Sequence, residues 1–235
     1  MALDERDDIR AVLSTHFLLK HLNDDELREL LRYARLRHAK AGEVLFQKGD
    51  PGDGLMAILD GRIKISSLSE EGKEVVLNIL GPGELFGEVA LIDGKDRSAD
   101  ASVMDAAELV VIDARDFMPF LQAPPELSTR LLMVLCERFR WVSDLYEDAV
   151  FRHLPARLAN HLLRLAETFG NEVEDGTRIT LKLSQQDLGN LMGTTRESVN
   201  KQMRAWTEDG LIRVDRGLIT IRDRDNLELW ADPDL

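Results

Sequence analysis

Several features that define whole classes of proteins are missing from this chain of 235 residues. Its one cysteine, Cys136, excludes a disulfide framework within the chain, and it excludes iron–sulfur or zinc sites built only from cysteines. No apolar run reaches the roughly 18 residues of a membrane-spanning helix. The N-terminal stretch MALDERDDIRAVLSTHF has no apolar signal core. We therefore expect a cytoplasmic protein with no membrane partner.

Motifs for catalysis are missing as well. The sequence has no serine–histidine–aspartate order, no metal-ligand spacing and no Walker loop for phosphate. Its histidines form no pattern that singles out a haem or metal ligand. We predict that the protein is not an enzyme and that it carries no metal, haem or iron–sulfur cluster.

Basic residues are outnumbered, with 30 Lys and Arg against 43 Asp and Glu and a net charge of -13. Such a charge argues at first against a nucleic-acid partner. Most of the acidic excess, however, lies before residue 151. The window 178–204 is locally basic, because it sets Arg178, Lys182, Arg196, Lys201 and Arg204 against Asp187 and Glu197. Nucleic acid therefore remains open as a partner.

The first half of the chain changes character near Gly42. Residues 1–41 place apolar side chains at helical spacing, as in LNDDELRELLRYARL, and are predicted to be helical. From Gly42 to about Asp113, glycines separate short apolar runs such as EVLF, LMAIL, RIKIS and EVVLNIL. Pairs such as Asp60-Gly61 are typical of tight turns between strands. This part is predicted to be a compact antiparallel β domain, either a barrel or a roll.

A long helix is predicted after Pro124-Pro125. The apolar positions that recur at heptad spacing are Leu131, Leu135, Val142, Leu145 and Ala149. Arg138 stands among them. An apolar seam on a long helix needs a partner, most simply a second copy of the chain. Packing only against the β domain of the same chain is the alternative. Arg138 requires a negative group nearby, because a buried unpaired charge is costly.

The last part, from Phe151, is predicted to run helix, helix, strand, helix, helix and hairpin. Ser184 and Asp187 form a capping-box-like start, Gly193 supplies a turn, and Thr195 caps a second helix. Two short helices joined in this way are typical of a helix-turn-helix. Arg196, Glu197, Asn200 and Lys201 lie on one polar face of the second helix. The hairpin LIRV-DRG-LITI favours a winged variant, although helix-turn-helix shapes also occur in proteins that do not bind DNA.

The stretch FGEVALIDGKDRSA, predicted to be a loop, carries a possible anion site. Arg97 offers a fork of donors suited to a phosphate, Ser98 a hydroxyl, and Glu88 an acceptor for a sugar hydroxyl. Composition alone favours a surface hairpin in which Arg97 pairs with Asp93 or Asp96.

Three separated motifs resemble one family. GEVLFQKGDPGDGLMAILDGRIKI and GPGELFGEVALIDGKDRSA resemble the β-roll of the CRP/FNR transcription regulators, and TTRESVNKQMRAWTEDGLI resembles their recognition helix. The resemblance, to the branch of cyclic-AMP receptor proteins, covers nearly the whole chain. It implies an α+β fold with a jelly-roll-like cyclic-nucleotide-binding β-roll and N-terminal helices at 1–123. It also implies a dimerisation helix at 124–150 and a winged helix-turn-helix DNA-binding domain at 151–235.

The resemblance implies a ligand site for cAMP, or alternatively for cGMP. Arg97 and Ser98 would bind the cyclic phosphate, Glu88 would bind the ribose 2′-hydroxyl, and Arg138 would lie nearby. The implied ligand-binding residues are Gly87, Glu88, Val89, Arg97, Ser98, Arg138, Val142 and Ser143. Val142 departs from the family pattern, because a valine cannot form a hydrogen bond with the base.

The resemblance also implies a homodimer that binds double-stranded DNA with palindromic TGTGA-type half-sites and contacts RNA polymerase. The implied DNA-binding residues are Ser184, Gln186, Thr195, Arg196, Glu197, Ser198, Asn200 and Lys201. Lys201 replaces an arginine of the family pattern. Two alternatives stay open: the same regulator responding to cGMP or to no ligand, and a cyclic-nucleotide-binding module that acts through protein partners.

Overall fold

The computed structural model describes residues 9, 11–12, 24–122 and 125–231. The chain divides into two compact units, Met1–Arg140 and Trp141–Leu235. Within the described residues, no helix has the length and apolar character needed to cross a membrane.

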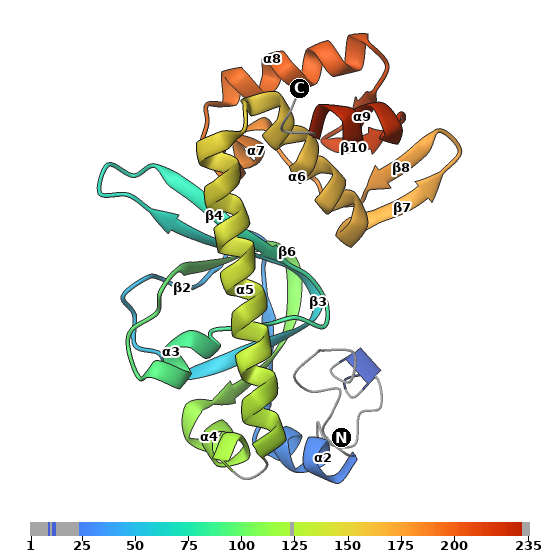
Figure 1. Cartoon of the computed structure of the whole chain (residues 1–235). Helices are drawn as coiled ribbons and strands as arrows, with labels where there is room; N and C mark the ends of the chain where they lie inside the picture. Colours follow the sequence, from blue (N-terminus) through green and yellow to red (C-terminus); the bar gives the residue numbers. More distant parts are fainter. Residues whose placement is uncertain (1–8, 10, 13–23, 123–124, 232–235) are drawn as a thin grey trace. The chain divides into compact units, whose positions relative to one another are not determined.

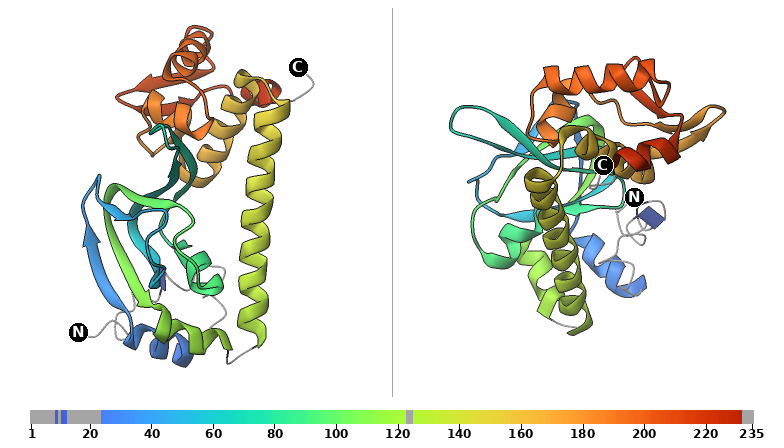
Figure 2. Two further views of the ribbon diagram at one scale, coloured as in Figure 1. Left: turned by 90° about the vertical axis from the view of Figure 1, so that its left-hand side faces the viewer. Right: turned by 45° about the horizontal axis from the view of Figure 1, so that its top comes forward.

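The first unit is built around one curved antiparallel sheet (Figures 1 and 2). The strand order is β1-β6-β3-β4, with β2 paired to β6 and β5 paired to β3. The pairing of the long strands β3 and β6 contains register shifts, which increase the local bend of a sheet. The strands are β1 (Arg35–Ala39), β2 (Val44–Phe46), β3 (Gly54–Leu68), β4 (Glu74–Leu80), β5 (Leu85–Phe86) and β6 (Asp100–Asp113).

Along the first part of β3 both faces of the sheet are buried, and successive side chains point to opposite faces. Leu55 and Ala57 on β3 pack in one core cluster with Phe117. Met56 and Ile58, the alternate residues, pack in a second cluster with Phe86, Val111 and others. The helices α2 (Asp24–Arg32) and α4 (Ala114–Gln122) close one end of the roll (Figure 1).

Two predictions for this unit were wrong. Residues 35–39 were expected to be helical but form β1, because all of them pair with β6. The loop expected at 86–99 contains a short helix, α3 (Glu88–Asp93). Left-handed backbone at Gly87 and Gly94 begins and ends this helix, so the two glycines confine it to the space beside β5. Most of the helix predicted within 1–23 lies outside the described residues.

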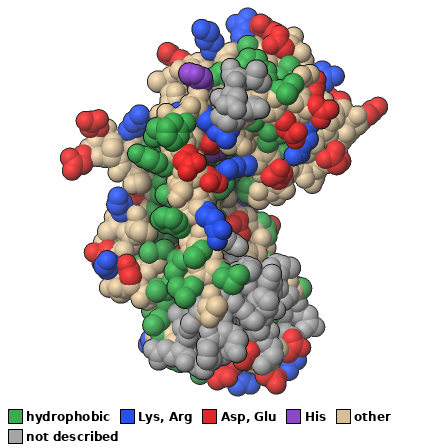
Figure 3. Space-filling model, in the orientation of Figure 1, with side chains coloured by type: hydrophobic (Ala, Val, Ile, Leu, Met, Phe, Trp, Pro, Cys, Tyr) green, Lys and Arg blue, Asp and Glu red, His purple; other side chains and the backbone are tan. Residues whose placement is uncertain are grey.

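The helix α5 (Pro125–Phe151) begins at a proline, a residue favoured in the first helical turn. Several of its exposed apolar side chains follow a line that lies to one side of the predicted seam, and Val142 of the seam is exposed as well. Large apolar side chains are exposed at Leu132, Phe139, Tyr146 and Val150, whereas Leu135, Arg138 and Leu145 are half-buried. Figure 3 shows hydrophobic side chains along this helix. Arg138 thus faces the fold of its own chain, whereas Val142 and Ala149 of the predicted seam are exposed, and the seam stays a prediction.

Among its described residues, the second unit contains the end of α5, four further helices and a small sheet in the order β7-β8-β10-β9. Its core contains Leu158, Leu162, Trp206, Ile219 and Leu227. The elements that follow α5 are α6 (Leu154–Phe169), β7 (Gly170–Val173), β8 (Gly176–Ile179), α7 (Gln185–Leu191), α8 (Arg196–Glu208), β9 (Ile212–Asp215), β10 (Leu218–Ile221) and α9 (Arg224–Ala231).

The helix-turn-helix and the following hairpin are confirmed in this unit. The order before them differs from the prediction, because one helix and a hairpin stand where two helices and a strand were expected. Residues Arg224–Ala231 form a further helix, α9, which packs on α6. The predicted fold class is confirmed: an α+β chain with a β-roll, a long helix and a winged helix-turn-helix.

Candidate functional sites

A pocket in the first unit collects most of the predicted ligand residues. It lies where β5 passes into α3, and Phe46, Gly87 to Ala90, Arg97 to Ala99 and Arg138 are among its lining residues. Gly87 has a φ of 85°, which favours glycine. A Cβ atom there would lie 2.6 Å from Nη1 of Arg97. Glycine at this position therefore lets the backbone approach the guanidinium closely.

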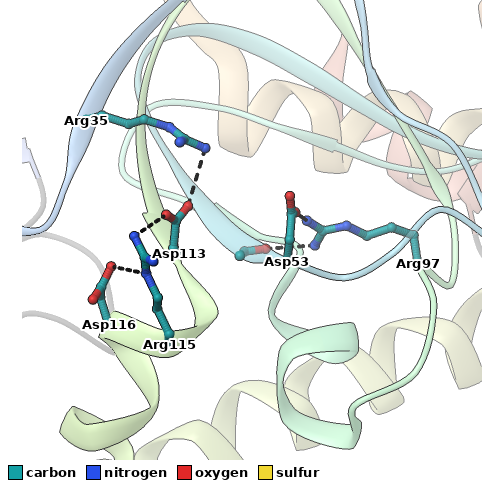
Figure 4. A network of polar contacts seen from close by, with 7 residues as sticks. Arg35, Asp53, Arg97, Asp113, Arg115 and Asp116 are labelled. Atoms are coloured by element: carbon teal, nitrogen blue, oxygen red, sulfur yellow. Dashed lines mark hydrogen bonds and ion pairs between the residues drawn. The ribbon is translucent and has the colours of Figure 1, made fainter.

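Arg97 is the buried cation of this pocket, with 4% of its surface exposed. Its Nη1 donates to the carbonyl oxygens of Gly54 (2.8 Å) and Gly87 (2.9 Å). Its Nη2 donates to Asp53 Oδ1 at 3.1 Å, as Figure 4 shows, and its guanidinium lies 4.3 Å from the centre of the Phe46 ring. The Nε–H group is buried and has no partner in the described part of the chain. Nη1 and Nη2 of the guanidinium are thus held by partners within the fold, while Nε–H remains available to donate to a ligand.

Glu88 is the buried anion of the pocket, with 3% of its surface exposed. Its Oε1 forms an ion pair with Nη1 of Arg138, and Nη2 of Arg138 donates to the Leu85 carbonyl oxygen at 2.6 Å. The Glu88 Oε2 atom is buried and has no partner among the described residues. Arg138 therefore has the negative neighbour that its position in the sequence required.

Among the described residues, the pocket thus contains a buried donor atom without a partner, Nε of Arg97, and a buried acceptor atom without a partner, Oε2 of Glu88. Leaving a buried polar group without a partner costs about 1–3 kcal/mol. A ligand with an anionic group and a nearby hydroxyl would satisfy both atoms. Glu84, a further acid near Arg138, ionises less readily than an exposed glutamate, because burial raises the pKa of its carboxyl.

The other predicted ligand residues fall into two groups. Val89 and Ser98 line the pocket together with Gly87. Val142 and Ser143 belong to the second unit, where Val142 is exposed and Ser143 is half-buried. Their part in a ligand site stays a prediction.

The sequence analysis missed Asp53 and Phe46, which contact Arg97. Both precede Arg97 by more than 40 positions, and Asp53 stands in a Gly- and Asp-rich stretch typical of turns. A second cavity of about 300 Å³ lies beyond Arg97, with Arg35, Asp53 and Asp113 in its wall. In its wall Asp113 lies 3.4 Å from Arg35, and Arg115, outside the lining, lies 3.7 Å from the same carboxylate (Figure 4).

The second candidate site is the helix-turn-helix of α7 and α8. Ser184 and Asp187 form the predicted capping box, in which Ser184 Oγ accepts from the Asp187 N–H and Asp187 Oδ2 accepts from the Ser184 N–H. Thr195 Oγ1 accepts from the Ser198 N–H at 3.2 Å. A Cβ atom at Gly189 would lie 3.0 Å from the Thr194 carbonyl oxygen, so glycine lets the turn pass close to α7.

The two faces of α8 have opposite character. Val199, Met203 and Trp206 are buried. The opposite face is exposed and polar, and it carries Arg196, Glu197, Asn200 and Lys201. Of the predicted DNA-binding residues, Ser184, Thr195 and Ser198 take part in helix caps, and Gln186 donates to Asn190 within α7 at 2.8 Å.

Two family models match the chain. The model described as a cyclic nucleotide-binding domain matches residues 36–123, and the one described as a Crp-like helix-turn-helix domain matches residues 156–230. The pocket lies in the first region except for Arg138, and α7 and α8 lie in the second.

Known proteins similar to the chain include two regulators. A CRP-like cAMP-activated global transcriptional regulator of Mycobacterium tuberculosis is 33% identical over 79% of this chain and 83% of that protein. A cyclic AMP receptor protein of Thermus thermophilus is 30% identical over 90% of this chain and 94% of that protein. The solved structure of a CRP/FNR-family transcriptional regulator, also from Thermus thermophilus, superposes with a TM-score of 0.70 and 28% identity, covering 84% of this chain and 98% of that one.

Proposed function

Since the chain belongs to the CRP/FNR family of transcription regulators, we propose that it is a homodimer whose affinity for DNA is raised by cAMP. Membership of the family makes it a DNA-binding regulator with a cyclic-nucleotide-binding domain, and not an enzyme. The proposal adds the identity of the ligand, the residues that bind it, the dimer and the coupling between ligand and DNA.

One observation carries the ligand assignment: the pocket contains a buried free donor and a buried free acceptor. We assign the Arg97 Nε–H and the Ser98 hydroxyl to the cyclic phosphate, and Glu88 Oε2 to the ribose 2′-hydroxyl. A charge-assisted hydrogen bond to phosphate is about twice as strong as a neutral one. Gly87 and Val89 bring their backbone close to the ligand, and Arg138 forms an ion pair with Glu88.

We assign the base of the ligand to adenine, with Ser143 as the hydrogen-bonding residue and Val142 as an apolar neighbour. The names of the two similar regulators, both of which refer to cAMP, support adenine over guanine. Because Val142 cannot form a hydrogen bond, selection against cGMP rests on Ser143 alone.

The exposed apolar line on α5 supports the homodimer. Leu132, Phe139 and Tyr146 recur at the seven-residue spacing of a coiled-coil seam, Val150 follows one turn later, and Phe139 is 74% exposed. Two copies that pack α5 against α5 would cover these side chains. We therefore assign 1–123 to ligand binding, 124–150 to dimerisation and 151–235 to DNA binding.

Coupling requires that the long helix be joined firmly to the DNA-binding helices. Asp148, a buried residue near the end of α5, forms an ion pair with Arg152 (2.8 Å) and accepts a hydrogen bond from Asn160 on α6 (3.1 Å). Ligand-dependent movement of α5 would thus be passed to α6. Coupling free energies between sites are typically about 1–3 kcal/mol.

For DNA we assign α8 to the major groove, as in other helix-turn-helix proteins. Arg196 and Lys201 can donate to guanine, and Glu197 can accept from cytosine N4. Two copies would bind palindromic half-sites of the TGTGA type about one helical turn apart. Contact with RNA polymerase completes the proposal.

A titration onto a fluorescent TGTGA-type palindrome tests the proposal. The protein is added without nucleotide, with cAMP and with cGMP, at one fixed salt concentration, because phosphate contacts make affinity strongly salt-dependent. We expect tight binding only with cAMP. An equal response to cGMP would overturn the adenine assignment, and tight binding without nucleotide would overturn the allosteric role.

A further inference from the structure

A hydrogen bond joins the two helices of the helix-turn-helix. Gln185, the first residue of α7, donates from Nε2 to Oδ1 of Asn200 on α8, at 2.9 Å. Gln185 is half-buried, and Asn200 is exposed. Asn200 was among the predicted DNA-binding residues, but Gln185 was not.

The bond leaves part of each amide free. A side-chain amide has one oxygen acceptor and two N–H donors. Within the described part of the chain, Gln185 Oε1 and Asn200 Nδ2 have no partner. Exchanging oxygen and nitrogen on both amides again leaves one amide oxygen and the neighbouring amide nitrogen without a partner. The pair therefore presents a two-point pattern to a ligand.

The position of the pair favours a base over the DNA backbone. Asn200 stands one helical turn after Arg196, so both side chains project from the same side of α8. The N-terminal part of a recognition helix is the part that contacts base edges. A second amide pair, Gln186 to Asn190, lies within α7 alone. The Gln185–Asn200 pair, in contrast, brings a residue of α7 next to the exposed polar face of α8 that carries Arg196.

We propose that Gln185 is a specificity-determining residue, which together with Asn200 reads the edge of one adenine in each half-site. Asn200 Nδ2 donates to adenine N7, and Gln185 Oε1 accepts from the N6 amino group. Adenine alone offers an acceptor and a donor side by side in the major groove; guanine offers two acceptors there. This inference rests on the proposed DNA binding, and it adds a residue and the base that it reads.

The test measures DNA affinity with saturating cAMP for the full chain. Each base pair of the TGTGA-type half-site is replaced in turn, and wild type is compared with Gln185→Ala, Asn200→Ala and the double variant. We expect wild type to prefer adenine over guanine at one position by at least roughly fivefold, the lower end for one two-point base contact. Either single variant should lose this preference, and the double variant should lose no more.

Two controls make the result specific. Gln202→Ala removes an amide from the other side of α8, and it should leave every preference unchanged. Replacing the adenine by 7-deazaadenine, which lacks the N7 acceptor, should weaken binding by wild type but not by Asn200→Ala.

The outcomes separate the pair from the wider proposal. If wild type distinguishes the palindrome from scrambled DNA and Gln185→Ala keeps the full adenine preference, the role of Gln185 is refuted and DNA binding stands. If wild type does not distinguish the two DNAs at all, sequence-specific DNA binding itself fails.

Discussion

Replacing Arg97 by lysine is expected to weaken cAMP binding by about 10- to 150-fold, since it removes one hydrogen bond to a charged group worth roughly 1.5–3 kcal/mol. The guanidinium uses Nη1 and Nη2 to bind Gly54, Gly87 and Asp53, which leaves Nε for the phosphate. A lysine keeps the charge but has one ammonium group, so it cannot contact these partners and the phosphate in the same arrangement. Alanine would be a poorer test, because it would leave the two buried carbonyl oxygens without a donor.

The assay is calorimetric titration with cAMP, together with urea unfolding of each variant without ligand. Unfolding separates a lost contact from a damaged pocket. Arg115→Lys is the matched control, because its side chain is 82% exposed and pairs only with acids outside the pocket. A folded Arg97→Lys variant whose affinity stays within twofold of wild type would refute the phosphate assignment.

Four further predictions concern other parts of the molecule. Asp53→Asn should change cAMP affinity by less than about fivefold, because this carboxylate is 83% exposed and exposed ion pairs contribute little. A larger loss of affinity in calorimetry would show instead that Asp53 is essential for positioning Arg97. Phe139→Glu should give monomers in analytical ultracentrifugation, whereas Tyr33→Glu, another exposed aromatic, should not. Arg196→Ala should weaken specific DNA binding by roughly 1–3 kcal/mol and relax base preference, measured against scrambled DNA. Burial lowers the pKa of His161 from 6.5 to about 4. As the pH falls, the imidazole is therefore protonated in the unfolded chain before it is protonated in the folded one. The free energy of unfolding should thus fall by up to about 3 kcal/mol between pH 6.5 and pH 4. Urea unfolding of His161→Gln at several pH values should lack this component.

The parts of the fold that sequence predicted best are those fixed by local chemistry. The capping box at Ser184, the cap at Thr195 and the hairpin turn before Leu218 all depend on residues close together in the chain. The strand β1 was missed because its pairing with β6 outweighs the helical spacing of its neighbours. Asp53 was missed for a similar reason, since only the folded roll brings it to Arg97.

The rotation of α5 about its own axis shows where local patterns stop being sufficient. The sequence offers two apolar lines along this helix, the predicted seam and the exposed line that contains Phe139. Both have heptad spacing, so spacing alone does not distinguish them, although they point in different directions because neighbouring residues differ by about 100° around the axis. What distinguishes them is Arg138, which forms an ion pair with Glu88 and donates to Leu85. A carboxylate as buried as that of Glu88 is stable only with a cation beside it. With Arg138 turned toward Glu88, Leu132 and Phe139 on the same helix are exposed, so the charge in the pocket helps to determine which apolar side chains of α5 stay uncovered within the chain.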